Sequence, residues 1–180
     1  WPIKEKLGVE VGFDNITGYG QLDDYPLYFN AKVGTPENSL FEHSPALVFG
    51  GYLFGTEHEK TDQNVYYLKA GETVTLGDVT LGRFSAGWFW GNDDLLVDAD
   101  DNTDANGVML TWERTISEIS DKLGVGLDYQ GSDSGVGALV PWVWWKFADN
   151  TVLNAGYVIP NNDDLAEQFV VELDIDFNVW

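Results

Sequence analysis

The last apolar stretch of the chain shows the clearest alternation of apolar and charged positions. In FVVELDIDF, the apolar residues from Phe169 to Phe177 alternate with Glu172, Asp174 and Asp176. Successive side chains of a β-strand point to opposite faces, so this alternation predicts a strand with one apolar face and one wet face. The apolar face either looks inward to a soluble core or outward to lipid around a polar lumen.

Similar alternation, interrupted by turn residues, recurs along the chain and predicts about ten strands with almost no helix. The connection 148–150 is short, whereas 91–107 is long and acidic. The pattern predicts a single all-β domain: a closed antiparallel up-and-down β-barrel of about 10 strands (roughly 8–12), of outer-membrane type. The expected strands cover residues 6–13, 25–33, 45–55, 63–71, 78–91, 107–114, 122–130, 137–147, 151–159 and 167–177.

Glycine and aromatic usage favours the barrel. Many of the 20 glycines fall inside the expected strands, where they ease the bending that a barrel needs. Pro141 lies inside an expected strand and removes a backbone donor, which predicts a bulge there. Aromatic side chains gather near strand ends, as in an interfacial girdle, although an aromatic-rich soluble core is the alternative. The girdle candidates are Tyr25, Tyr28, Tyr66, Tyr67, Trp88, Trp90, Trp142, Trp144 and Trp145.

Composition removes several classes of function. The 180-residue chain has 30 acidic and 9 basic residues, a net charge of −21, which argues against binding nucleic acid. It has no cysteine, which excludes disulfides, thiolate metal sites and cysteine nucleophiles. Its 44% hydrophobic content argues against disorder. Trp1 opens without a charged and apolar leader, so we expect an exported protein whose signal peptide has been removed.

Several segments resemble a poorly characterised family of bacterial outer-membrane β-barrel, porin-like proteins. The main match is 121–163, from DKLGVGLDYQ to YVIPNND, followed by the terminal strand ending VVELDIDF. The segments 28–37, 61–67 and 82–93 resemble earlier strands of the family. Phe177 matches the terminal aromatic residue that such proteins present to the barrel-assembly machinery, and the extra NVW departs from the pattern.

The resemblance implies a place in the bacterial outer membrane, with the lipid bilayer and the barrel-assembly machinery as partners. A homo-oligomer is compatible with it. Family members carry further sequence before the point that matches Trp1, so we expect that an N-terminal portion is missing. The family supplies a fold and a location rather than an activity.

If lipid is outside, the polar faces of the strands line a lumen in which cations and carboxylates should pair across strands. Two readings stay open: a selective passage for ions or small solutes, or a salt-bridged plug, because about ten strands leave a small bore. Any pore should favour cations, since acidic groups are in excess. The expected lumen residues are Glu10, Asn30, Lys32, Lys69, Arg83, Glu113, Asp128, Lys146, Asn154, Glu172, Asp174 and Asp176.

The acidic loop DDLLVDADDNTD offers Asp98, Asp100, Asn102 and Asp104 at alternate positions, as calcium loops do. It lacks the glycine and glutamate of an EF-hand, so the alternatives are a generic Ca²⁺ site and a solvated acidic loop. We expect no other cofactor.

Enzymatic activity is not expected. No spacing pairs two glutamates for glycoside hydrolysis, and neither histidine lies in a nucleophile or metal motif. The alternative to a membrane barrel is a soluble or surface β-barrel or sandwich that binds a ligand or serves as an assembly subunit. That alternative would bury Leu173, Ile175 and Phe177.

Overall fold

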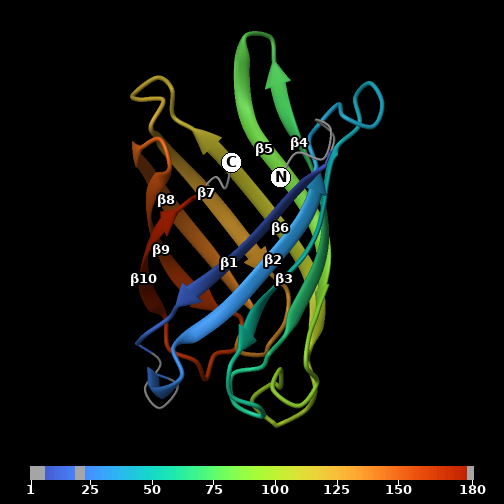
Figure 1. Ribbon diagram of the computed structural model, residues 1–180, viewed down its shortest axis with the longest axis vertical. Helices are drawn as coiled ribbons and strands as arrows, with labels where there is room; N and C mark the ends of the chain where they lie inside the picture. The colour runs from blue at the N-terminus through green and yellow to red at the C-terminus, as the bar shows by residue number, and fades with distance from the viewer. Residues whose placement is uncertain (1–6, 19–22, 178–180) are drawn as a thin grey trace.

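The computed structural model describes residues 7–18 and 23–177 and contains ten strands (Figure 1). Within these residues, no helix is long and apolar enough to cross a membrane. The strands are β1 (Gly8–Asn15), β2 (Leu27–Thr35), β3 (Ala46–Gly55), β4 (Val65–Leu76), β5 (Val79–Trp90), β6 (Asn106–Thr115), β7 (Leu123–Gln130), β8 (Ala138–Ala148), β9 (Thr151–Pro160) and β10 (Gln168–Ile175).

All ten strands match expected segments. The largest difference is at the end of β4, which runs to Leu76 instead of ending near residue 71. The added residues continue the ladder with β5, and Gly77 closes the hairpin with a φ of 61°. A left-handed backbone of this kind favours glycine. This long β4–β5 hairpin projects at the top of Figure 1.

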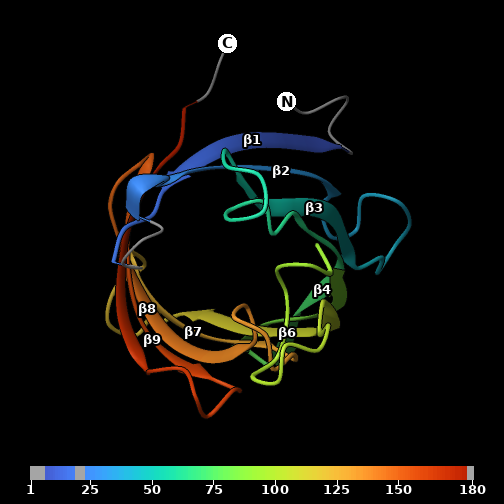
Figure 2. The same ribbon diagram turned by 90° about the horizontal axis from the view of Figure 1, so that it is seen from below.

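The strands form one antiparallel sheet in the order β1 to β10, each pairing with its neighbours in the chain. The expected up-and-down arrangement is therefore confirmed. The sheet curls into an open half-barrel around a lumen (Figure 2), but no ladder joins β1 to β10 among the residues described. The predicted closure is wrong.

The charge on the two open edges gives a physical reason for the open seam between β1 and β10. Asp174 on β10 faces Glu10 and Asp14 on β1, close enough for mutual repulsion, and Lys32 is the cation that attracts it. Like charges that face each other destabilise strand pairing. These charges therefore disfavour a ladder between the two edges.

The two rims of the half-barrel differ. One rim, at the top of Figure 1, carries the tight turns 77–78 and 149–150, and we call it the hairpin rim. The opposite rim carries the loops 56–64, 91–105 and 131–137, and we call it the loop rim. Short and long connections are separated between the rims only in part, because the hairpin rim also carries longer loops.

Most large apolar side chains of the strands lie on the outside of the sheet and are exposed, whereas those near the loop rim, such as Val65 and Phe89, are buried. In β10 and just beyond it, Leu173 is 55% exposed, Ile175 44% and Phe177 80%. The same holds around the sheet, for example for Phe13, Leu68 and other large residues of β1 to β9. A soluble core built from these residues is therefore absent from the described part of the chain.

The aromatic residues divide between the two faces. Trp90 and Tyr66 stack on the outer face with ring centroids 6.2 Å apart, and Trp145 is exposed there too. In contrast, Tyr67, Trp142 and Trp144 line the lumen, so the girdle prediction is wrong for these three. The predicted bulge at Pro141 is also wrong, because the β8–β9 register is the same on both sides of it and shifts only between Lys146 and Ala148.

Candidate functional site in the lumen

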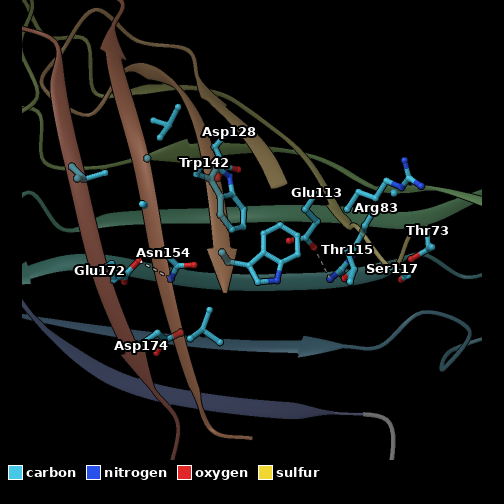
Figure 3. A pocket seen from close by; sticks show the side chains of 18 of the residues that line it. Thr73, Arg83, Glu113, Thr115, Ser117, Asp128, Trp142, Asn154, Glu172 and Asp174 are labelled. Atoms are coloured by element: carbon cyan, nitrogen blue, oxygen red, sulfur yellow. Dashed lines mark hydrogen bonds and ion pairs between the residues drawn. The ribbon is translucent and has the colours of Figure 1, made fainter. Parts of the chain in front are cut away.

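The inside of the half-barrel holds two adjoining cavities of about 930 and 810 Å³. Both are lined by Lys32, Arg83, Glu113, Asp128 and Trp142, so they are two parts of one polar lumen. Figure 3 shows several of these side chains pointing into the same space from different strands. This lumen is the candidate functional site.

Most of the residues predicted to face the lumen line these cavities. Asn30 does not; it donates a 2.8 Å hydrogen bond to Asp14. Lys146 lies near the end of β8, and Asp176 lies beyond β10, where its backbone N–H donates to Asn150 over 2.9 Å. The predicted residues that do line the cavities are Glu10, Lys32, Lys69, Arg83, Glu113, Asp128, Asn154, Glu172 and Asp174.

Two lumen cations pair with carboxylates directly opposite them in the ladder. Lys32 Nζ lies 2.8 Å from Glu10 Oε1, across the β1–β2 pair. Arg83 Nη1 lies 3.8 Å from Glu113 Oε1 across the β5–β6 pair, and its Nε lies 3.5 Å from Glu37. The expected cross-strand pairing is therefore present at these two positions. Such pairs fix side-chain positions inside the lumen more than they stabilise the fold.

The third lumen cation has no carboxylate this close. Lys69 Nζ donates a 2.5 Å hydrogen bond to Thr111 Oγ1, with Asp128 and Glu113 as more distant attracting charges. Lys69 therefore joins β4 to β6 through a neutral partner. The lumen cations thus leave part of the lumen's negative charge without a close partner.

The excess negative charge lies on β10. Asn154 donates a 3.4 Å hydrogen bond to Glu172 (Figure 3), and Lys32 attracts Asp174 across the open seam. Among the described residues, no lysine, arginine or histidine nitrogen lies within 4.0 Å of either carboxylate. This side of the lumen attracts cations.

Two indole rings form part of the lumen wall, and sequence reasoning did not place them there. The rings of Trp142 and Trp144 lie 5.0 Å apart at an interplanar angle of 36°. A Cβ on Gly124 would lie 1.9 Å from the Trp144 ring, and one on Gly126 would lie 2.4 Å from the Trp142 ring. The glycines of β7 therefore make room for both indoles. The sequence did offer a signal: Trp142 and Trp144 alternate in step with Lys146, which was predicted to face the lumen, so alternation places all three on the same face.

An apolar cluster borders the lumen at the loop rim. Val65, Phe89, Leu96 and Ala105 are all buried there and pack together. Leu96 belongs to the loop 91–105, which turns inward at this end of the barrel (Figure 2). The loop residues thus pack against the wall of the lumen at this end.

Hydrogen bonds also join the walls and loops at this end of the lumen. Tyr52 on β3 donates a 2.7 Å hydrogen bond to Gln130 Oε1 on β7, on the far wall. Ser132 donates to the Asp104 carbonyl over 2.7 Å, and Asn161 donates to the Gln130 carbonyl over 2.8 Å. The loops after β5, β7 and β9 are therefore tied together.

The acidic loop is held by hydrogen bonds of its own. Asp98 Oδ1 accepts hydrogen bonds from the backbone N–H groups of Asp100 and Asn102, each 2.9 Å long. The hydrogen bond from the backbone N–H of Asn102 lowers the pKa of Asp98 below its usual range. Asp104 instead accepts from the backbone N–H of Asp133. In the described residues, no three acidic or histidine side chains gather as a ligand set, and Ca²⁺ binding here stays a prediction.

A second titrating pair lies in the loop 56–64 on the same rim. His58 Nδ1 and Asp62 Oδ2 are 2.9 Å apart. This hydrogen bond raises the pKa of His58 and lowers the pKa of Asp62. The protonated histidine and the ionised carboxylate therefore support each other.

We expect this pair to stabilise the loop only in mildly acidic solution. The contribution of His58 is present below about pH 6.5 and is lost as pH rises through its raised pKa; that of Asp62 is present above about pH 3.9 and is lost as pH falls through its lowered pKa. An NMR titration should give His58 a pKa above about 6.5. In Asp62→Asn the pKa should fall; an unchanged value would contradict the pairing.

Comparison with known proteins adds no relative to this picture. No family model, no curated protein and no solved structure matches the chain. The argument for function therefore rests on the sequence and on the geometry of the half-barrel.

Proposed function

We propose that the chain is an outer-membrane-type, porin-like β-barrel protein of the bacterial envelope that allows slow, passive passage of small cations. The observation that carries the proposal is the inverted distribution of side chains. Large apolar residues such as Leu68, Leu173 and Phe177 are exposed on the outer face, whereas ion pairs such as Lys32–Glu10 lie inside. Barrels in lipid have this arrangement, apolar outside and polar inside.

The apolar cluster and the Tyr52–Gln130 hydrogen bond at the loop rim favour slow passage over an open pore. Both narrow the space through which an ion would pass. The acidic excess near Glu172 and Asp174 favours cations over anions. Single-channel recordings in planar bilayers should give small, infrequent, cation-selective events, and anion selectivity would contradict this part of the proposal.

The open seam needs an account, because unpaired backbone groups are costly in hydrocarbon. The carboxylates and Lys32 near the seam belong to the polar lumen. We therefore propose that water from the lumen reaches the seam and hydrates the unpaired backbone groups of the two edges. The outer belt of apolar side chains would then be the lipid contact. Phe177, exposed just beyond β10, is the residue we assign to recognition by the barrel-assembly machinery.

The experiment that tests the membrane assignment is extraction with and without detergent, followed by gel migration of unheated and boiled samples. We expect the protein to need detergent and to migrate differently when it is boiled, because a folded barrel resists denaturant until it is heated. A monodisperse protein in plain buffer would overturn the membrane proposal. It would favour the soluble binding module instead.

A further inference from the structure

One lateral row of lumen positions combines an aromatic ring with an unpaired carboxylate. Gly124 on β7 is the ladder partner of Trp144 on β8, Trp144 of Asn154 on β9, and Asn154 of Glu172 on β10. These four residues therefore follow one another around the wall at one height. Three of them line the larger cavity: Trp144, Asn154 and Glu172.

The next row provides a second ring beside the first. Gly126, Trp142 and Gly156 are ladder partners across β7, β8 and β9. The glycines seat the indoles against the wall, so the rings present surface to the cavity. Trp142 Nε1 is buried, and no described residue accepts a hydrogen bond from it. An aromatic platform is thus present in the lumen, whose Trp142, Asn154 and Glu172 are seen in Figure 3.

The spacing of this row suits a small organic cation. Neighbouring strands are about 4.8 Å apart, so the backbones of Trp144 and Glu172, two strands apart, are separated by roughly 10 Å. A cation binds within about 6 Å of an aromatic centroid, and an ion pair to a carboxylate needs about 4 Å or less. An ammonium cation placed between Trp144 and Glu172 would satisfy both contacts.

We propose that the lumen has a binding site for small organic ammonium cations, built from Trp142, Trp144 and Glu172. The ammonium lies over the indoles and next to the carboxylate. The proposal rests on the proposed function in naming the solute class, but the site itself needs only the lumen.

The chemistry of the site disfavours other ligands. An anion would be repelled by Glu172 and Asp174, which lack a close cation among the described residues. A bare metal ion would bind better to a ring of oxygen ligands than to the aromatic platform. A neutral sugar would leave the carboxylate without a counter-ion. An organic cation uses the rings and the charge together.

The test is calorimetric titration of the purified protein in detergent micelles with choline chloride at constant ionic strength. Its neutral isostere, 3,3-dimethylbutan-1-ol, is the first comparison and should bind at least about tenfold more weakly. Equal binding of the two would overturn the role of charge. Glycerophosphocholine, the headgroup form without net positive charge, should not bind; affinity equal to that of choline would overturn selection by the carboxylates.

Variants localise the site. Trp144→Leu and Glu172→Gln should each lower the choline affinity by about fivefold to thirtyfold. The matched controls Trp145→Leu and Glu72→Gln replace exposed residues that line neither lumen cavity and should leave the affinity unchanged. Each variant is first checked for heat-modifiable migration or, if the wild type lacks it, for an unchanged circular dichroism spectrum. Site variants that fold and bind choline like wild type would overturn the proposal.

The two proposals fail in different ways. A protein that needs detergent and is heat-modifiable, but gives no heat with choline, would keep the membrane assignment and remove the binding site. A protein that is stable in plain buffer but binds choline through Trp144 would keep the site and remove the membrane assignment.

Discussion

Replacing Phe89 with alanine is expected to lower the free energy of unfolding by about 3–5 kcal/mol, because it empties the centre of the cluster at the loop rim. Phe89 is fully buried against Val65, Leu96 and Ala105, with Met109 beside them. Few other buried side chains could fill the space, since the buried cluster is small. Denaturant unfolding in detergent micelles, followed by tryptophan fluorescence, measures the change.

The matched control is Phe41→Ala. Phe41 lies in the loop between β2 and β3 and is exposed, so its removal should change the unfolding free energy by less than about 0.5 kcal/mol. Phe89→Ala should also raise single-channel conductance, because the cluster borders the lumen at the loop rim. Equal stability of the two variants would show that the cluster does not hold this end together.

Placing a positive charge on the outer face is expected to have an effect of similar size. Leu68→Arg puts a guanidinium in the middle of β4, where the wild-type leucine is 55% exposed. If this face meets lipid, the change should lower the free energy of unfolding by about 2–4 kcal/mol. Folding titrations in lipid vesicles measure it.

A second leucine makes the result decisive. Leu40 is 47% exposed but lies in the loop 36–45 outside the strands, so Leu40→Arg should change stability by less than about 0.5 kcal/mol. The two leucines differ little in exposure and differ mainly in which solvent the proposal gives them. If both arginine variants are as stable as wild type, the outer face meets water and the membrane proposal is wrong.

The strands were predictable because each carries its own signal. Alternation and turn residues act over a few positions, and strand ends such as those of β5 and β9 differ from the prediction by a residue at most. Cross-strand pairs such as Lys32–Glu10 also followed, since opposite charges on neighbouring strands of one face should meet. Local pattern thus determined the order and the faces of the strands.

The features that depend on distant contacts were not predictable in this way. Leu96 looks like an ordinary apolar residue in an acidic loop, and only the fold brings it against Phe89. Trp142 and Trp144 were predicted to belong to the same girdle as Trp145. Alternation puts these two on the face opposite to that of Trp145. Their lumen position became clear only beside Gly124 and Gly126, which are on a different strand.

The missing ladder between β1 and β10 changes what determines the bore of this molecule. In a closed barrel, strand number and stagger together fix the radius, so the width cannot vary without breaking hydrogen bonds. An open sheet has no such geometric constraint. The charges at the seam, where Lys32 attracts Asp174 and the carboxylates repel each other, are therefore expected to influence its curvature. We expect the width of the seam to change with the ionic composition of the lumen.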